Sequence, residues 1–328
     1  MRTLVTGWFS FERADATAGD LLAKDVVCGW LEEADHPYDV ALAAPFGGGV
    51  RFETADPQRY SHVVFVCGPF FRGNLLRRFE RCRLVGVNLS MVEPVEDWNP
   101  FDLLLERDST TAGYPDVTFL SQDRPVPVVG VTLIEPADVP AHEDSYRDAN
   151  AAISDLLARR EAATVTIDTR LDVPNRAGLR TAAEVECLIT RMDVLVTTRL
   201  HGLVLAVKNG VPAIAIDPVP GGGKLSRQAE AIGWPLVFAA DVAPAELERA
   251  FDRCLGRDAA ALAWRSREAA IAGLGVVRES FISAMRCDDP AGAWGDGRRQ
   301  RAWVEPKATE RGGPAGRLRA ALRGLVGR

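Results

Sequence analysis

One stretch of the sequence, residues 192–224, limits the possible folds more than any other, because it reads as strand, helix and strand in direct succession. Residues 192–196 form a short apolar run, which is typical of a strand buried on both faces. The segment 201–209 has its apolar residues at helical spacing and follows two threonines that are good helix caps. Gly210 stands where a helix ends, and residues 213–216 form a second apolar run. The stretch therefore predicts one βαβ unit of a parallel sheet, with a very short helix.

The charged residues of this unit come where its two strands end. Arg199 and His201 follow the first strand, at the start of the predicted helix, where unpaired N–H groups and the helix dipole favour an anion. Lys224 follows the second strand after three glycines, which let a backbone come close to a ligand. Because the carboxyl ends of parallel strands meet at one edge, these side chains are expected to converge. Together they predict a site for a small anion that carries a phosphate and a carboxylate.

Apolar runs and helical patterns alternate along most of the chain, which predicts the α/β class with parallel sheets and helices on both faces. Prolines at 125 and 127 mark a linker between two series of such elements. We therefore expect an N-terminal domain over residues 1–125 and a C-terminal domain over residues 126–287. Among the individual elements, the pattern predicts a basic helix at 74–81, a short strand at 117–120 and one long helix at 259–285.

The composition changes after residue 287, where Gly, Pro and Arg dominate and no periodicity persists. Residues 298–328 contain nine Lys or Arg residues against two Glu. This predicts a disordered basic tail over residues 288–328. Residues 317–328 could also form a short basic amphipathic helix on anionic lipid, but short isolated helices are marginal in water, so a solvated tail is the favoured interpretation.

Charge and composition exclude several classes of protein. The net charge of −6 argues against a nucleic-acid binder. The six cysteines are scattered without paired spacing, so we expect neither a disulfide framework nor a zinc site, and we see no metal requirement. No apolar run is long enough to span a bilayer, and Gly7 interrupts the apolar start too early for a signal peptide. A cytoplasmic protein is expected, with the inner face of the membrane as an alternative location.

The segment Thr198-Arg199-Leu200-His201, followed by the short apolar helix, Gly210-Val211-Pro212 and an apolar strand, resembles the polysaccharide pyruvyl transferases. The resemblance extends more weakly over residues 3–285. Gly7-Trp8-Phe9 and Gly19-Asp20 look like the family's glycine and Gly-Asp elements, and Glu106-Arg107-Asp108 looks like its Arg-Asp segment after a strand. The resemblance implies a GT-B-like fold, in which two Rossmann-like, doubly wound domains face a cleft. The first domain would be on the acceptor side and the second would bind the donor.

The family implies phosphoenolpyruvate as the donor substrate, with no further cofactor, and a saccharide or lipid-linked saccharide as the acceptor. The product would be a pyruvate ketal on an envelope or exopolysaccharide precursor. Such chemistry needs a grip on a carboxylate and a phosphate, and an acid that protonates the enol carbon. The resemblance implies His201 and Asp20 as catalytic residues, and it implies as substrate-binding residues Arg199, Leu200, Lys224, Gly7, Gly19 and Arg107.

Most of these residues also have a simpler explanation. A histidine at a helix start is usually a capping or packing group, although the neighbouring Arg199 favours a functional His201. Asp20 is explained on local grounds as the N-cap of a helix beginning at Leu21. Arg107 and Asp108 are explained as a surface ion pair, and Lys224 as an exposed lysine in a glycine loop. In that loop the family has an aromatic residue and closer lysine spacing, where this chain has Asp217 and additional Pro and Gly.

Further features leave alternatives open. Phe70, Phe71 and Arg72 replace small residues of the family's glycine turn, and they suit either a sugar-stacking surface or a packing cluster. A nucleotide-sugar glycosyltransferase of GT-B fold would need an acidic residue for the ribose, for which Glu184 and Glu186 are the candidates. A non-catalytic family member, acting as a binding or scaffold protein, is the third hypothesis. Weak membrane contact through the tail and a homo-oligomer are the remaining partner hypotheses.

Overall fold

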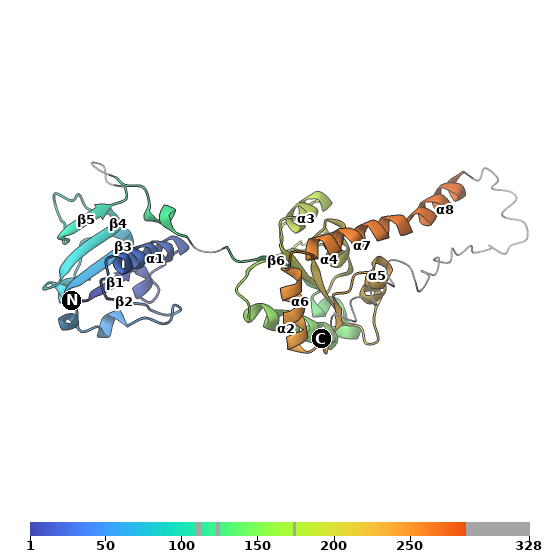
Figure 1. Cartoon of the computed structure of the whole chain (residues 1–328), viewed down its shortest axis with the longest axis horizontal. Coiled ribbons are helices and arrows are strands. Elements are labelled where there is room, and N and C mark those ends of the chain that lie inside the picture. The colour runs from blue at the N-terminus through green and yellow to red at the C-terminus, as the bar shows by residue number, and fades with distance from the viewer. Residues whose placement is uncertain (109–112, 123–124, 173–174, 287–328) are drawn as a thin grey trace, which may run out of the picture. The chain divides into compact units, whose positions relative to one another are not determined.

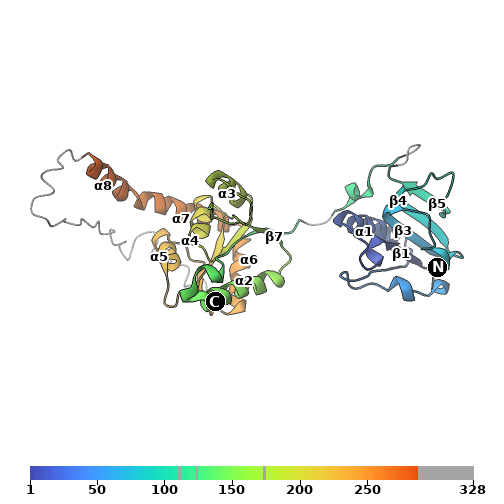
Figure 2. The ribbon, with the colours of Figure 1, turned by 180° about the vertical axis from the view of Figure 1, so that it is seen from behind.

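The computed structural model of the chain describes residues 1–108, 113–122, 125–172 and 175–286 (Figures 1 and 2). The predicted basic tail therefore lies outside the described residues, as does Cys287. The chain divides into two compact units, one from Met1 to Arg124 and the other from Pro125 onward. Each unit contains a five-stranded sheet in which all pairs of neighbouring strands are parallel.

The sheet of the first unit has the order β2-β1-β3-β4-β5. Its strands are β1 (Thr3–Gly7), β2 (Tyr38–Val40), β3 (His62–Phe70), β4 (Arg83–Met91) and β5 (Leu103–Glu106). Helix α1 (Ala18–Glu33) covers one face and buries Ala23 and Val27 against the valines of β1, β3 and β4. The opposite face packs against aromatic side chains from short 3₁₀ turns, among them Phe52 and Phe79.

The predicted basic helix at 74–81 is wrong, because only a 3₁₀ turn, η4 (Arg77–Phe79), forms there. Phe79 turns fully into the core, and the Arg78 guanidinium donates to the carbonyl oxygens of residues 52, 53 and 55. The predicted strand at 117–120 is also wrong. It is a 3₁₀ turn, η5 (Val117–Leu120), which Asp116 caps by accepting the Thr118 N–H. In both places tertiary and turn contacts outweigh the local pattern.

The second unit repeats the same topology, with the order β10-β9-β8-β6-β7. Numbered within each unit, both sheets follow the order 2-1-3-4-5, one of the two common doubly wound orders. The strands are β6 (Val128–Thr132), β7 (Ala163–Thr166), β8 (Val194–Thr197), β9 (Ala213–Asp217) and β10 (Val237–Ala239). The α/β class with two doubly wound parallel sheets is thus confirmed. The GT-B arrangement, in which the two domains face a cleft, stays a prediction.

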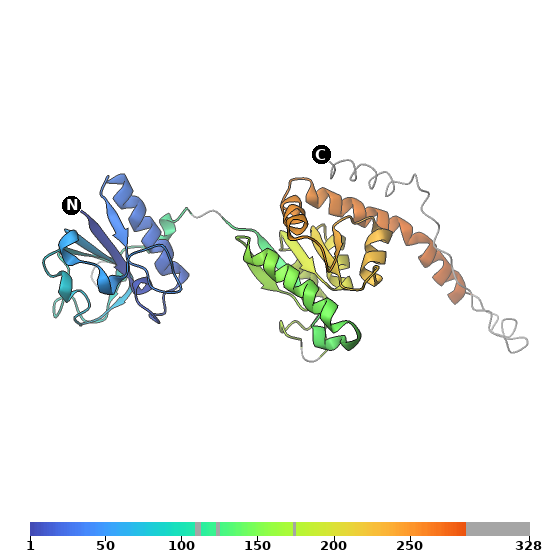
Figure 3. The same ribbon diagram turned by 90° about the horizontal axis from the view of Figure 1, so that it is seen from below.

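The helices of the second unit cover both faces of its sheet (Figure 3). They are α2 (Glu143–Ala158), α3 (Ala182–Ile189), α4 (Leu200–Lys208), α5 (Lys224–Ile232), α6 (Pro244–Cys254), α7 (Ala259–Gly273) and α8 (Gly275–Met285). Helices α2 and α6 pack together, whereas α4 contacts α3 and α5, and α7 packs on α4 and α5. The predicted long helix at 259–285 is two helices that meet at Leu274. Gly273 and Gly275 flank this break, and glycine is a weak helix former.

Candidate functional site

The predicted anion site falls at the carboxyl edge of the second sheet, between β6 and β8. These two neighbouring strands end level, because Thr132 pairs with Thr197 in the parallel register. The chain leaves β6 for one face of the sheet and leaves β8 for the other, since α2 and α4 lie on different sides. Ligands of open α/β sheets bind at such a topological switch point. Arg199 and His201 are therefore in the expected place.

A set of threonine hydrogen bonds fixes the path from β8 into α4. Thr197 Oγ1 donates to the Thr132 carbonyl oxygen at 2.7 Å and accepts the Arg199 N–H at 2.9 Å. Thr198 Oγ1 accepts the Ile134 N–H at 2.9 Å, and the Asn150 side-chain amide donates to the Ile134 carbonyl at 3.0 Å. The segments that follow β6 and β8 are thereby tied together. The N-cap of α4 is Arg199, not one of the two predicted threonines.

Gly202 allows α4 to start directly against these strand ends. A Cβ atom at this position would lie 2.3 Å from Thr197 Oγ1 and 3.2 Å from Thr132 Cγ2. Both distances are shorter than ordinary van der Waals contact, so any larger residue would push the first turn of α4 away from the sheet. Sequence reasoning singled out Arg199 and His201 and overlooked this glycine, although it directly follows His201.

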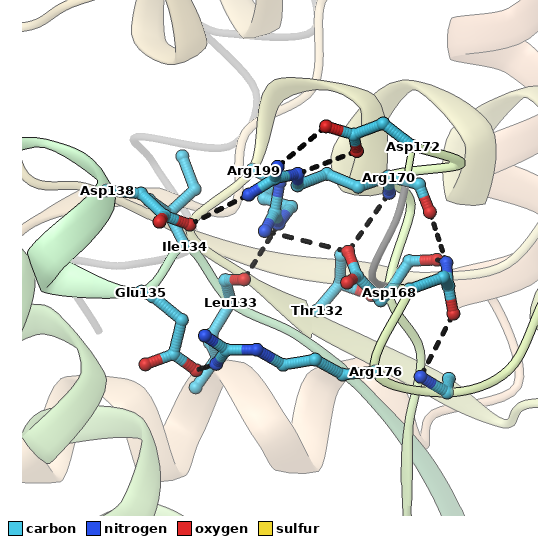
Figure 4. A network of polar contacts seen from close by, with 12 residues as sticks. Thr132, Leu133, Ile134, Glu135, Asp138, Asp168, Arg170, Asp172, Arg176 and Arg199 are labelled. Atoms are coloured by element: carbon cyan, nitrogen blue, oxygen red, sulfur yellow. Dashed lines mark hydrogen bonds and ion pairs between the residues drawn. The ribbon is translucent and has the colours of Figure 1, made fainter.

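Arg199 reaches across the switch point toward the end of β6 (Figure 4). Its Nε donates to the Leu133 carbonyl oxygen at 2.7 Å, and its Nη2 lies 3.6 Å from Oδ1 of Asp168, just after β7. The side chain is 15% exposed. Among the described residues none forms a hydrogen bond with Arg199 Nη1. The guanidinium is therefore held by the hydrogen bond of Nε and the longer ion pair of Nη2, while the Nη1 N–H groups stay available for an anion.

The other arginines of this network are paired with carboxylates at shorter distances than the 3.6 Å between Arg199 and Asp168. Arg170 Nε and Nη2 donate to the Asp172 carboxylate, and Arg170 Nη1 donates to the Asp138 carboxylate. All three of these side chains are exposed to solvent. Arg176 pairs with Glu135. The hydrogen bonds that Arg170 donates to Asp172 raise the pKa of the Arg170 guanidinium above its ordinary value. Arg199 is thus the arginine of this network best placed to receive an additional anion.

His201 lies in the first turn of α4 and is exposed, whereas Leu200, the first residue of the helix, is partly buried. No described residue forms a hydrogen bond with the imidazole. The simpler explanation for His201, a capping or packing role, therefore has no contact to support it in the described part of the chain. The imidazole is free to meet a ligand held at the same helix end.

The loop before Lys224 is organised by Asp217. The buried Asp217 carboxylate accepts N–H groups of Gly223 at 2.7 Å and Ser226 at 2.8 Å, and the Ser226 hydroxyl at 2.6 Å. Burial alone would raise the pKa of Asp217, but these hydrogen bonds outweigh it and hold the pKa below its ordinary value. The carboxylate thus caps α5 from within, while Lys224 at the start of that helix is exposed. An incoming phosphate would have to compete with Asp217 for the N-terminus of α5.

Tyr146, on α2, joins the two parts of this edge. The phenol is buried, which raises its pKa, and the charge of Asp217 raises it further while that of Arg199 lowers it. The Tyr146 phenol thus lies within electrostatic range of both Asp217 and Arg199, and sequence reasoning did not identify it. The polar residues of this edge lie at or just after strand ends, namely Thr132, Asp168, Thr197 and Asp217, and of these sequence reasoning missed Thr132 and Asp168.

In the first unit, the predicted residues are mostly engaged in its own structure. Helix α1 begins at Ala18, so the predicted cap at Asp20 is wrong by position; Thr17 is the N-cap and Asp20 completes a capping box. Asp20 Oδ2 accepts from the Thr17 N–H and hydroxyl, each at 2.7 Å. A Cβ at Gly7 would lie 2.5 Å from the Val66 carbonyl oxygen, so Gly7 is needed for packing. Gly19, in the first turn of α1, has no such close neighbour.

Arg107 forms an ion pair, as its simpler explanation suggests, but mainly with Asp116. Its Nη1 lies 3.0 Å from Asp116 Oδ2 and its Nη2 donates to Ser90 Oγ at 3.0 Å, while Asp108 is 3.7 Å away. The same cluster contains Cys67 and Asn88, which have positive φ angles of 67° and 60°. Burial, followed by the hydrogen bond with Asp20, raises the pKa of the Cys67 thiol to about 11.

The two carboxylates on which the glycosyltransferase alternative depended are occupied. Glu184 completes the capping box of α3 and binds Arg180, and Glu186 pairs with Lys208 and Asn209. A cavity of about 230 Å³ lies away from the strand ends, between α2 and α6. Within the described ranges, no group of three or more His, Cys, Asp or Glu side chains is placed to hold a metal ion. No helix in those ranges combines the length and apolarity needed to cross a bilayer.

Comparison with known proteins identifies one family. Residues 106–218 match the polysaccharide pyruvyl transferase family. The matched segment includes Arg107, the Arg199–His201 helix start and Asp217, and it ends before the start of α5. Among curated proteins, none matches the sequence.

Solved structures with a similar fold include enzymes that act on nucleotide sugars or carry sugar-transfer names. Spinosyn forosaminyltransferase SpnP shares 15% identity at a TM-score of 0.31, covering 87% of this chain and 99% of its own. The calicheamicin glycosyltransferase CalG4 shares 12% sequence identity at a TM-score of 0.32, over 88% of this chain and 99% of CalG4. The UDP-GlcNAc 2-epimerase of Methanocaldococcus jannaschii shares 8% sequence identity at a TM-score of 0.31, over 86% of this chain and 99% of the epimerase.

Proposed function

We propose that the protein is a pyruvyl transferase that takes phosphoenolpyruvate as donor and forms a pyruvate ketal on a saccharide of an envelope or exopolysaccharide precursor. The observation that carries this proposal is the Arg199 guanidinium. It is held at the switch point by Leu133 and Asp168, its Nη1 has no partner among the described residues, and it lies at the N-terminus of α4, two residues before the exposed His201. The family match over the same residues supports it.

The two anionic groups of the donor fit two kinds of partner at this edge. The guanidinium suits bidentate contact with either a carboxylate or a phosphate, and the N–H groups of the first turn of α4 suit the other group. We assign the anion to α4 rather than to α5, because the Asp217 carboxylate already caps α5. Lys224 then contributes charge from the edge of the site instead of a direct cradle.

His201 would carry the proton chemistry. The imidazolium gives its proton to the methylene carbon of phosphoenolpyruvate, whose π electrons form the new C–H bond and leave an oxocarbenium-like C2. An acceptor hydroxyl forms a C–O bond to C2 and returns a proton to the imidazole. A second hydroxyl then displaces phosphate, which leaves with that hydroxyl's proton as the ketal ring closes. Asp20 is assigned to holding the start of α1, because its Oδ2 accepts both the N–H and the hydroxyl of Thr17.

The test uses the full-length protein with phosphoenolpyruvate and a panel of saccharides. Phosphate release and the methyl signal of the ketal should appear together, and only with the right acceptor. Arg199→Lys should weaken donor binding by about tenfold or more, because a lysine cannot bind bidentately. His201→Gln should leave donor binding nearly unchanged and lower turnover by about 10²–10⁴-fold. Lys208→Ala, a cation at the other end of α4, is the matched control and should change neither.

Other results would point elsewhere. If a uridine or guanosine diphosphate stabilises the protein against heat and phosphoenolpyruvate does not, the chain acts as a nucleotide-sugar glycosyltransferase. If the donor binds through Arg199 but no acceptor supports phosphate release, the chain is a non-catalytic binding member. If donor binding survives Arg199→Lys undiminished, the assignment of this site is wrong.

A further inference from the structure

The first unit carries an exposed aromatic ring at the carboxyl edge of its own sheet. Trp8 follows β1 and Phe71 follows β3, the two strands on either side of the switch point in this sheet. The two rings are stacked, with centroids 5.6 Å apart and planes 19° from parallel. Phe71 is 52% exposed, whereas the preceding Phe70 is 3% exposed and packs in the core. One face of the Phe71 ring is thus supported by Trp8 while much of the rest faces solvent.

The supporting indole is rigidly held. Its Nε1 donates to the Pro69 carbonyl oxygen at 2.9 Å, and the edge of Phe65 contacts it at a centroid distance of 5.7 Å. Gly68, with a φ of 82°, makes room for it, because a Cβ there would lie 2.5 Å from Trp8 Cδ1. A side chain of any size at position 68 would break the stack. The left-handed backbone at Gly68, near the end of β3, therefore leaves room for Trp8 beneath Phe71.

Polar groups lie on the segments that flank this ring. The backbone N–H of Arg72 donates to Glu93 Oε2 at 2.9 Å, and its Nη2 donates to the Asp97 carbonyl at 2.9 Å. No described residue forms a hydrogen bond with Arg72 Nη1. A half-exposed aromatic ring, with a guanidinium on the next residue and a carboxylate bound to that residue's N–H, matches one ligand class in particular. A pyranose ring has an apolar face of C–H groups that packs on an aromatic ring, and a rim of hydroxyls that needs donors and acceptors.

We propose that Phe71, backed by Trp8 and followed by Arg72 with its partner Glu93, is the stacking platform for a pyranose ring of a saccharide ligand. The inference deepens the proposed function, on which it rests for its meaning, because it names where the acceptor saccharide binds. A protein partner fits less well, since stable interfaces bury roughly 800 Å² on each side and a single half-exposed ring offers far less.

Saturation-transfer NMR on the full-length protein, without any donor, tests the platform. The probes are methyl glycosides of glucose, galactose, mannose and N-acetylglucosamine, together with their β-linked disaccharides. At least one should receive saturation on the C–H protons of one ring face. Phe71→Ala and Phe71→Leu should weaken that binding by about tenfold, whereas Phe71→Tyr should retain it. Phe119→Ala, which removes an 85% exposed ring elsewhere in the same unit, is the matched control and should have no effect.

Three outcomes would overturn the inference. The first is that no probe shows binding that depends on Phe71. The second is that Phe71→Leu binds as well as the natural protein, because a stacking role needs an aromatic ring. The third is that Phe71→Ala changes the sedimentation coefficient but not glycoside binding, which would make the ring a protein contact. Titration of the same variants with phosphoenolpyruvate separates the two proposals. Phosphoenolpyruvate should bind Phe71→Ala as tightly as it binds the natural protein. If the natural protein does not bind phosphoenolpyruvate, that result counts against the proposed function alone.

Discussion

Replacing Gly202 by alanine should separate the stability of the protein from its ability to bind a donor. The added methyl group would lie 2.3 Å from Thr197 Oγ1 and 3.1 Å from Thr197 Cβ. Restoring ordinary contact near 3.4 Å needs about 1 Å of movement, either of the first turn of α4 or of the Thr197 side chain. Either movement disturbs the hydrogen bond at 2.9 Å that fixes the Arg199 N–H.

The two effects of this change have different sizes. Overpacking costs about 1–3 kcal/mol, and the better helix propensity of alanine returns about 1 kcal/mol. The free energy of unfolding should therefore fall by only about 0–2 kcal/mol. Donor binding should fall much further, by about tenfold to a hundredfold, because a displacement of about 1 Å is enough to spoil a positioned ion contact.

Urea unfolding and calorimetric titration with phosphoenolpyruvate measure the two quantities on the same protein. The control is Gly29→Ala in the interior of α1, where an added Cβ meets nothing within 4 Å. That variant should gain about 1 kcal/mol of stability with unchanged donor binding. If Gly202→Ala behaves like Gly29→Ala in both measurements, the close approach of α4 to the strand ends does not position Arg199, and the reasoning is refuted.

Other consequences of the structure can be measured separately. Asp217→Asn should lower the free energy of unfolding by about 2 kcal/mol at neutral pH. Because the folded-state pKa of Asp217 is depressed, this loss of stability should shrink as pH falls below about 4. A loss that does not depend on pH would contradict the carboxylate's role. Iodoacetamide should label the exposed Cys187 rapidly in the native protein, whereas Cys67 and Cys254, which are buried and have raised pKa values, should react only on unfolding. Peptide mapping by mass spectrometry measures the three labelling rates, and equal rates would refute this order. Gly210→Ala should lower the midpoint of thermal unfolding, because the φ of Gly210 is 74° and an added Cβ would lie 2.3 Å from the Trp264 ring. A midpoint equal to that of the natural protein would show that Trp264 moves aside without cost.

The succession of strands and helices along the chain was predicted well wherever a buried strand is followed by a helix. The βαβ unit around Arg199 has one periodicity for each element and a glycine at its helix end, so its elements were placed within two residues. The α/β class followed from the same alternation. These features depend on local pattern, which a single sequence contains.

The features that were missed depend on contacts between distant residues. Nothing local indicates that Thr197 would bond to the Thr132 carbonyl, 65 residues earlier, or that Arg78 would cap the carbonyls of a loop 23 to 26 residues before it. Asp217 was noted as a departure from the family, but its function as an internal cap of α5 became visible only from its hydrogen bonds. Residue type gave the candidates, and tertiary geometry decides which groups remain available.

The central claim is that an enol phosphate binds at the N-terminus of α4 through Arg199. A ¹⁵N–¹H NMR titration of the full-length protein with phosphoenolpyruvate tests it most directly, by following the backbone amides of Leu200, His201 and Gly202. The account predicts that these three signals shift together with one dissociation constant, and that Arg199→Lys weakens that constant by about tenfold or more. If they stay still while the amides of residues 223–226 shift, the donor binds at α5 and the claim is contradicted.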